Sequence, residues 1–81
     1  MSIQDSHLVV KLREAMENYR RRTGVRLTYA SLSRQTGISQ ATLQSLAARR
    51  SYNTRLSTIA RLCTALECSP ADLLELHETQ R

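Results

Sequence analysis

The sequence predicts an all-α fold: a compact five-helix domain with a helix-turn-helix at its centre. The chain has 81 residues, of which 41% are hydrophobic, so it can form one core and has no room for a second. Two glycines, one proline and the lack of long β-branched runs favour helices over strands. We therefore treat residues 1–81 as a single domain, with its core at about 8–76 and short flexible termini.

The first two helices are expected on either side of a short connector, TGVRL. The first should run from about Ser6 to Arg22 and end at Gly24, because apolar residues recur through it at helical spacing. These apolar residues are Leu8, Leu12, Ala15, Met16 and Tyr19. The second helix is short. Thr28 is placed to cap its start, and Gly37 can supply the left-handed backbone that closes its last turn.

The third helix, 40–48, begins three residues after that glycine, with Ser39 as its expected cap. Its buried face should consist of Leu43, Leu46 and Ala47. Two short helices joined by so tight a turn are typical of a helix-turn-helix, in which Ile38 would fill the space beneath the turn. An ordinary helical hairpin needs a similar apolar pattern, so spacing alone leaves both interpretations open.

A polar, basic loop, RRSYN, separates the third helix from the fourth. Asn53 or Thr54 should cap the fourth helix. Its core stripe is expected to consist of Leu56, Ile59, Ala60, Cys63 and Leu66, widened by Leu62. The fifth helix opens in SPADLLEL, with Ser69 as the cap, Pro70 at the first helical position and Asp72 completing a capping box. Its apolar residues are Leu73, Leu74 and Leu76.

Charge is distributed unevenly along the chain, whose formal net charge is +5. No acid occurs between Asn18 and Leu66, and that interval holds nine cations, all arginines. They are Arg20, Arg21, Arg22, Arg26, Arg34, Arg49, Arg50, Arg55 and Arg61. Because soluble surfaces usually mix the two signs, a block of one sign indicates an anionic partner, and nucleic acid fits best.

The outer face of the third helix supports the same partner. The residues left outside its apolar face are uncharged: Gln40, Ala41, Gln44, Ser45 and Ala48. A solvated helix would more often carry Glu and Lys there. Glutamine can bond adenine with two hydrogen bonds, serine suits several base edges, and alanine can contact the thymine methyl group. We therefore expect Gln40, Ala41, Gln44 and Ser45 to read bases, while flanking arginines bind phosphates.

Over about four fifths of its length, from Leu12 to Leu76, the chain resembles helix-turn-helix domains of the phage lambda repressor and Cro superfamily, also called the XRE family. LTYASLSRQTGISQATLQSL resembles the family's two-helix core, and LSTIARLCTALECSPADLLEL resembles its fourth and fifth helices. The resemblance implies a five-helix domain whose third helix enters the major groove. It also implies a sequence-specific transcriptional regulator, expected to be a repressor, that binds a double-stranded DNA operator as a homodimer.

Site residues carry over by position. Gln40 matches a base- or phosphate-contacting glutamine, Ala41, Gln44 and Ser45 match variable specificity positions, and Arg49 and Arg50 match basic residues after the reading helix. Phosphate contacts are expected from Thr28, Tyr29, Ser39, Thr42, Arg49, Arg50, Tyr52 and Arg55. The chain departs from the family pattern at Tyr29, where glutamine is common, and at Ser33, where alanine is usual. It also has Ala47 where glutamate is frequent and Arg55 where a capping serine is common.

Two other functions remain open at this point. An antitoxin-like or other protein-interaction module usually needs a further partner-binding segment, and only about five residues follow the expected fifth helix. An RNA-binding protein usually presents aromatic side chains for stacking, and only Tyr19, Tyr29 and Tyr52 are available.

Other classes of function are not expected. The sequence has no glycine-rich phosphate loop, no nucleophile with a nearby histidine and no carboxylate pair in its basic region, so we predict neither an enzyme nor a cofactor. Cys63 and Cys68 are expected as buried free thiols, and His7 and His77 lie near opposite ends, so no metal site is predicted. No small-molecule effector is indicated. With no membrane-length apolar stretch and no leader pattern, a cytoplasmic, nucleoid-associated protein encoded by a bacterium or phage is expected.

Overall fold

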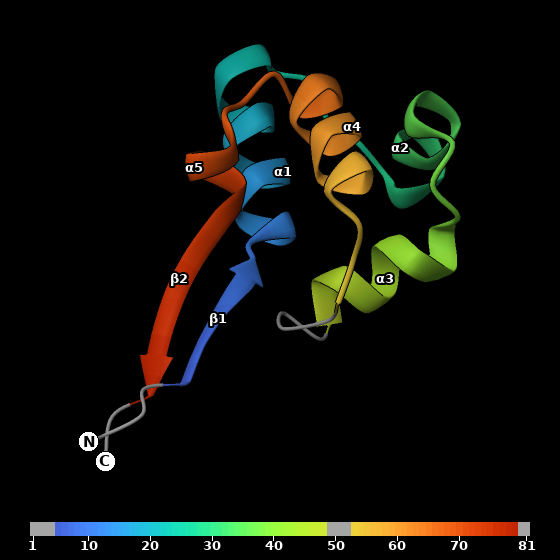
Figure 1. The fold of residues 1–81 in the computed structure, drawn as a ribbon. Coiled ribbons are helices and arrows are strands. Elements are labelled where there is room, and N and C mark those ends of the chain that lie inside the picture. Colours follow the sequence, from blue (N-terminus) through green and yellow to red (C-terminus); the bar gives the residue numbers. More distant parts are fainter. Residues whose placement is uncertain (1–4, 49–52, 80–81) are drawn as a thin grey trace, which may run out of the picture.

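The computed structural model describes residues 5–48 and 53–79. Helices pack together at one end of the molecule, and two strands project from them as a ribbon (Figure 1). In chain order the elements are β1 (Asp5–Val10), α1 (Leu12–Thr23), α2 (Tyr29–Thr36), α3 (Gln40–Ala48), α4 (Leu56–Leu66), α5 (Pro70–Leu73) and β2 (Leu74–Thr79). No helix in the described part of the chain has the length and apolar character needed to cross a bilayer.

The two strands correct the all-α prediction. β1 and β2 pair antiparallel, with Leu8 opposite Leu76 and His7 opposite His77. The first helix therefore begins at Leu12, not near Ser6. Adjacent β-branched residues at Val9 and Val10 favour extended backbone, and strand pairing supplies partners that lie far away in the sequence. The four-residue spacing of Leu8 and Leu12 also fits a helix. The local pattern therefore predicted a helix where the structure has a strand.

The fifth helix exists but has only four residues. Its expected start is confirmed, because the Asp72 carboxylate accepts hydrogen bonds from the Ser69 backbone N–H at 3.2 Å and from the Ser69 hydroxyl at 3.1 Å. Leu74 then takes extended backbone angles and begins β2. From there apolar Leu74 and Leu76 alternate with polar Glu75 and His77, a period of two that suits a strand with one apolar face.

The core draws leucines from all five helices. The fully buried ones are Leu12, Leu32, Leu43, Leu46, Leu62, Leu66 and Leu73. In α4 the buried stripe is Ile59, Leu62 and Leu66, with Cys63 half-buried beside it. The predicted stripe was wrong at Leu56, which is 82% exposed at the first position of the helix, and at Ala60, which is also exposed.

The capping residue of α4 also differs from the prediction. Arg55, not Asn53 or Thr54, occupies the N-cap position, and its side chain makes no capping hydrogen bond. Its backbone carbonyl accepts from the N–H groups of Thr58 at 3.0 Å and Ile59 at 3.2 Å. Helix α4 therefore starts without the side-chain oxygen that usually satisfies an early N–H.

Cys63 and Cys68 are free thiols and half-buried. Burial, followed by the neighbouring Cys63 thiol, raises the pKa of Cys68 to about 11. The Cys68 thiol is therefore protonated at neutral pH and is a poor nucleophile and metal ligand. This agrees with the expectation that the cysteines serve packing, although they are less buried than predicted.

Candidate nucleic-acid interface

The turn between α2 and α3 is fixed by hydrogen bonds within a few residues of sequence. Gly37 has φ of 76°, and its N–H donates to the Ser33 carbonyl at 2.8 Å. The buried Thr36 hydroxyl donates to the Leu32 carbonyl at 2.7 Å and accepts from the Ile38 N–H at 3.1 Å. Ile38 is buried beneath the turn, as its position predicted. The role of Thr36 was not predicted, because threonine is common at exposed helix ends and only the fold shows its burial.

Helix α3 is held against the core by the three residues that its spacing predicted. Leu43, Leu46 and Ala47 are buried. Its opposite side is open: Gln40, Ala41, Gln44 and Ala48 are exposed, and Ser45 is partly exposed. The helix therefore presents a neutral surface of small and amide side chains, while its opposite face packs against the core. That surface matches the groups that can bond base edges in the major groove.

Hydroxyl groups surround the starts of α2 and α3, and each has a structural partner. Thr28 Oγ1 accepts from the Ser31 N–H at 3.1 Å, and Ser31 Oγ accepts from the Thr28 N–H at 2.9 Å, a capping box. Ser39 Oγ accepts from the Thr42 N–H at 3.1 Å and donates to Thr42 Oγ1 at 2.9 Å. The expected caps are therefore confirmed. Phosphate binding by Thr28, Ser39 and Thr42 stays a prediction.

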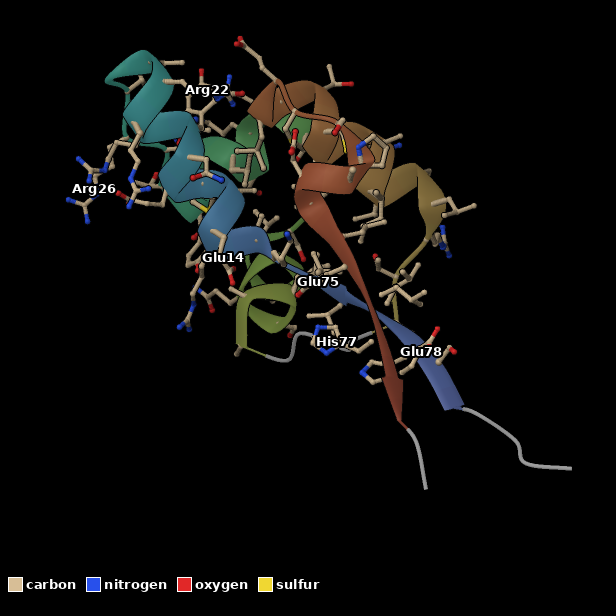
Figure 2. The ribbon with its side chains drawn as sticks, turned by 90° about the vertical axis from the view of Figure 1, so that its left-hand side faces the viewer. Glu14, Arg22, Arg26, Glu75, His77 and Glu78 are labelled. Atoms are coloured by element: carbon tan, nitrogen blue, oxygen red, sulfur yellow. The ribbon has the colours of Figure 1, made fainter. Side chains whose placement is uncertain are left out.

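Tyr29, at the start of α2, lies half-buried in a hollow that also contains three arginines. Arg13, Arg20 and Arg26 line this hollow with Tyr29 and Glu17. Figure 2 shows Arg26 extending away from the body of the molecule beyond α1. Three guanidinium groups against one carboxylate give the lining of this hollow a net positive charge, which favours an anion. Arg13 and Arg20 were not among the predicted contacts, although their seven-residue spacing places them on one face of α1.

Some arginines of the acid-free block have structural partners instead. Arg20 donates to the Glu17 carboxylate at 2.7 Å, and Arg21 lies 3.6 Å from it. The hydrogen bond from Arg20 lowers the pKa of Glu17, which therefore stays ionised at neutral pH. Arg22 donates to the Leu66 carbonyl at the end of α4 at 2.8 Å, where a cation suits the helix dipole. The basic block thus contributes to folding as well as to surface charge.

The remaining predicted contacts follow α3. Arg55 is exposed at the start of α4. Arg49, Arg50 and Tyr52 fall in the segment between the described ranges, so the structure does not place them. Within the described residues no group of three or more histidine, cysteine, aspartate or glutamate side chains is arranged to hold a metal ion. The described residues thus combine an uncharged outer face on α3, hydroxyl groups at the starts of α2 and α3, and an exposed arginine at the start of α4.

Comparisons with known proteins agree with this geometry. Residues 12–78 match the family described as the Cro/C1-type HTH DNA-binding domain. The uncharacterized HTH-type transcriptional regulator YozG of Bacillus subtilis (strain 168) is 40% identical over 50 residues, which are 62% of this chain and 60% of YozG. The chain thus spans less than two thirds of that relative's length, and no solved structure matches it. Because the family match covers most of the chain, including both helices of the turn, the protein belongs to the Cro/C1-type helix-turn-helix DNA-binding family.

Proposed function

We propose that the protein is a sequence-specific transcriptional regulator, with repression as the expected mode, that reads the major groove of double-stranded DNA with α3. The observation that carries this proposal is the neutral, exposed outer face of α3, formed by Gln40, Ala41, Gln44 and Ser45, within a strongly basic chain. Base edges are read by hydrogen bonds and methyl contacts, which such side chains can make. The transcriptional-regulator name of YozG supports the same role.

Phosphate binding would position the reading helix. We assign this role to Thr28, Tyr29, Ser39, Thr42, Arg49, Arg50, Tyr52 and Arg55, and add Arg13 and Arg26 from the hollow at Tyr29. Arginine is suited to this work because its planar guanidinium donates two parallel hydrogen bonds to phosphate oxygens. Such contacts carry little sequence information but fix the register of the protein on the duplex.

One short helix reads too few base pairs to define a site within a genome, so we propose that the protein acts as a homodimer. Helix-turn-helix dimers bind two half-sites about one helical turn apart, and the operator repeats the two-fold symmetry of the protein. The selected DNA should therefore contain an inverted repeat.

Selection of bound duplexes from a random library, followed by titration with salt, tests this function. We expect an inverted-repeat motif, and an affinity that falls by roughly 10³-fold or more between 50 and 200 mM salt if about 5–8 phosphates are contacted per protomer. Single-stranded RNA should compete poorly. Recovery of no motif, a flat salt response, or preference for the RNA would each contradict the proposal.

A further inference from the structure

The ribbon brings together the two histidines of the chain. His7 lies directly opposite His77 in the antiparallel pair, and their ring centroids are 5.7 Å apart. Opposite residues of such a pair point to the same face, with Cβ atoms about 4.5–5.5 Å apart. Both side chains are exposed, so an ion in solution can reach them. Their separation in the sequence argued against a common site, and the strand pairing removes that argument.

The spacing of the two rings suits a shared metal ion. Imidazole nitrogens bind a metal such as zinc at about 2.0–2.1 Å, so two rings on one ion have centroids about 4.5–6.5 Å apart, depending on the angle between the two bonds. The observed 5.7 Å lies inside that range. The ring planes are tilted by 33°, and exposed side chains can rotate to aim one nitrogen each at a common point. Both imidazoles can therefore bind the same ion without a change in the strand pairing.

Glu75 lies beside His77 on the same face of the ribbon. Its Oε1 atom is 3.0 Å from His77 Nε2. A neutral imidazole that donates from Nε2 has its lone pair at Nδ1, where a metal can bind. Histidines that bind metals usually donate their other N–H to a carboxylate or carbonyl, which fixes the ring and makes it a stronger ligand. Glu78 lies on the other side of the ribbon, away from the histidine ring (Figure 2).

We propose that His7 and His77 form a binding site for a late first-row divalent cation such as Zn²⁺ or Ni²⁺, with Glu75 positioning His77. These ions favour imidazole ligands, whereas Mg²⁺ and Ca²⁺ favour oxygen. Among the described residues no cluster of three or more histidine, cysteine, aspartate or glutamate side chains is arranged to hold a metal. The protein therefore supplies two ligands, and water fills the remaining coordination positions.

An ion bound there would connect the first strand to the last. Leu8 and Leu76, next to the two histidines, are 52% and 58% exposed, so little side-chain packing holds the outer ribbon together. Two-stranded ribbons without further support are marginally stable in water. A ligand that binds only the paired form stabilises that form by mass action. The ion should therefore keep the outer ends of the two strands paired.

Calorimetric titration of the full chain with Zn²⁺, Ni²⁺ and Mg²⁺ tests the site. We expect Zn²⁺ and Ni²⁺ to bind and Mg²⁺ not to bind at the same concentrations. His7→Phe keeps an aromatic ring opposite His77 but removes one ligand. It should raise the Kd for Zn²⁺ at least tenfold, because the second of two linked donors is lost. Circular dichroism checks that the variant is folded, and a wild type that binds Zn²⁺ no tighter than His7→Phe would overturn the proposal.

Two glutamine variants test the positioning role of Glu75. Glu75→Gln should raise the Kd for Zn²⁺ about tenfold, the lower end of the effect of losing the carboxylate behind a metal-binding histidine. Glu78→Gln is the matched control, because it removes the same charge from the other side of the ribbon. It should change the Kd less than about twofold, since exposed charges are screened by salt. Equal effects of the two variants would overturn the role of Glu75.

Hydrogen exchange of backbone amides measures whether the ion links the strands. At a free Zn²⁺ concentration of about ten times the Kd, the amides around Leu8 and Leu76 should exchange about tenfold more slowly in the wild type. His7→Phe at the same Zn²⁺ concentration should show no such slowing. Unchanged exchange in a wild type that binds Zn²⁺ would place the ion elsewhere and overturn the proposal. Equal slowing in the wild type and His7→Phe would overturn it as well.

Discussion

The helix-turn-helix and the ribbon both contain leucines, but they differ in how much of that apolar surface is buried. In α2 and α3 every large apolar side chain but Tyr29 is buried, and the exposed face of α3 is uncharged. In the ribbon, Leu8 and Leu76 are exposed on strands that have few other partners. The helix-turn-helix therefore buries most of its large apolar side chains within one chain. The ribbon leaves apolar side chains exposed and, among the described residues, has an unpaired strand edge. The two regions therefore differ in how completely one chain buries its own apolar side chains.

The largest expected difference between the two regions concerns stability. Leu43→Ala should lower the free energy of unfolding by about 2–5 kcal/mol, because it leaves a cavity beneath α3 where no side-chain surface is exposed. Leu8→Ala removes the same atoms from a half-exposed position and should cost less than about 1 kcal/mol. Urea denaturation monitored by circular dichroism compares them. Equal losses would show that the ribbon is as tightly integrated as the helical core.

A smaller effect is expected at the turn. Gly37 and Gly24 have φ of 76° and 75°, and neither has a heavy atom within 4 Å of where a Cβ would stand. Each change to alanine should therefore cost about 1–2 kcal/mol from backbone conformation alone. Only Gly37→Ala should also weaken DNA binding beyond its effect on folding, since Gly37 sets the angle between α2 and α3. If Gly24→Ala weakened binding equally, the turn would have no special role.

The smallest expected effects concern Arg55, where one substitution should change stability and DNA binding in opposite directions. Arg55→Ser should stabilise the fold by about 0.5–1 kcal/mol, because serine can cap α4 where arginine does not. The same change should weaken binding to all duplexes about equally and reduce the salt dependence, if Arg55 contacts a phosphate. Thermal unfolding and salt titration measure the two effects. A variant that gains stability without losing affinity would remove Arg55 from the interface.

The parts of the fold that were predicted from sequence are those determined by nearby residues. Thr28 with Ser31, Ser39 with Thr42, and Gly37 with Ser33 each interact within four positions, so their spacing was enough. The ribbon depends on pairing between Leu8 and Leu76, whose separation hides it from local periodicity. The hollow at Tyr29 was not predicted for the same reason: local periodicity does not show that Arg13 of α1 and Arg26 of the following connector line one hollow.

The central claim, that the neutral face of α3 reads bases, is tested most directly by comparing two exposed glutamines. Gln44 lies on that face, whereas Gln35 lies on α2 in a groove with Ala60 and Arg61 of α4. Duplex selection should be run on the wild type, Gln44→Ala and Gln35→Ala. We expect Gln44→Ala to lose preference at one base-pair position in each half-site, equivalent to about 1–3 kcal/mol there, while Gln35→Ala keeps the wild-type motif. An unchanged motif for Gln44→Ala, or the same change for both variants, would contradict base reading by α3.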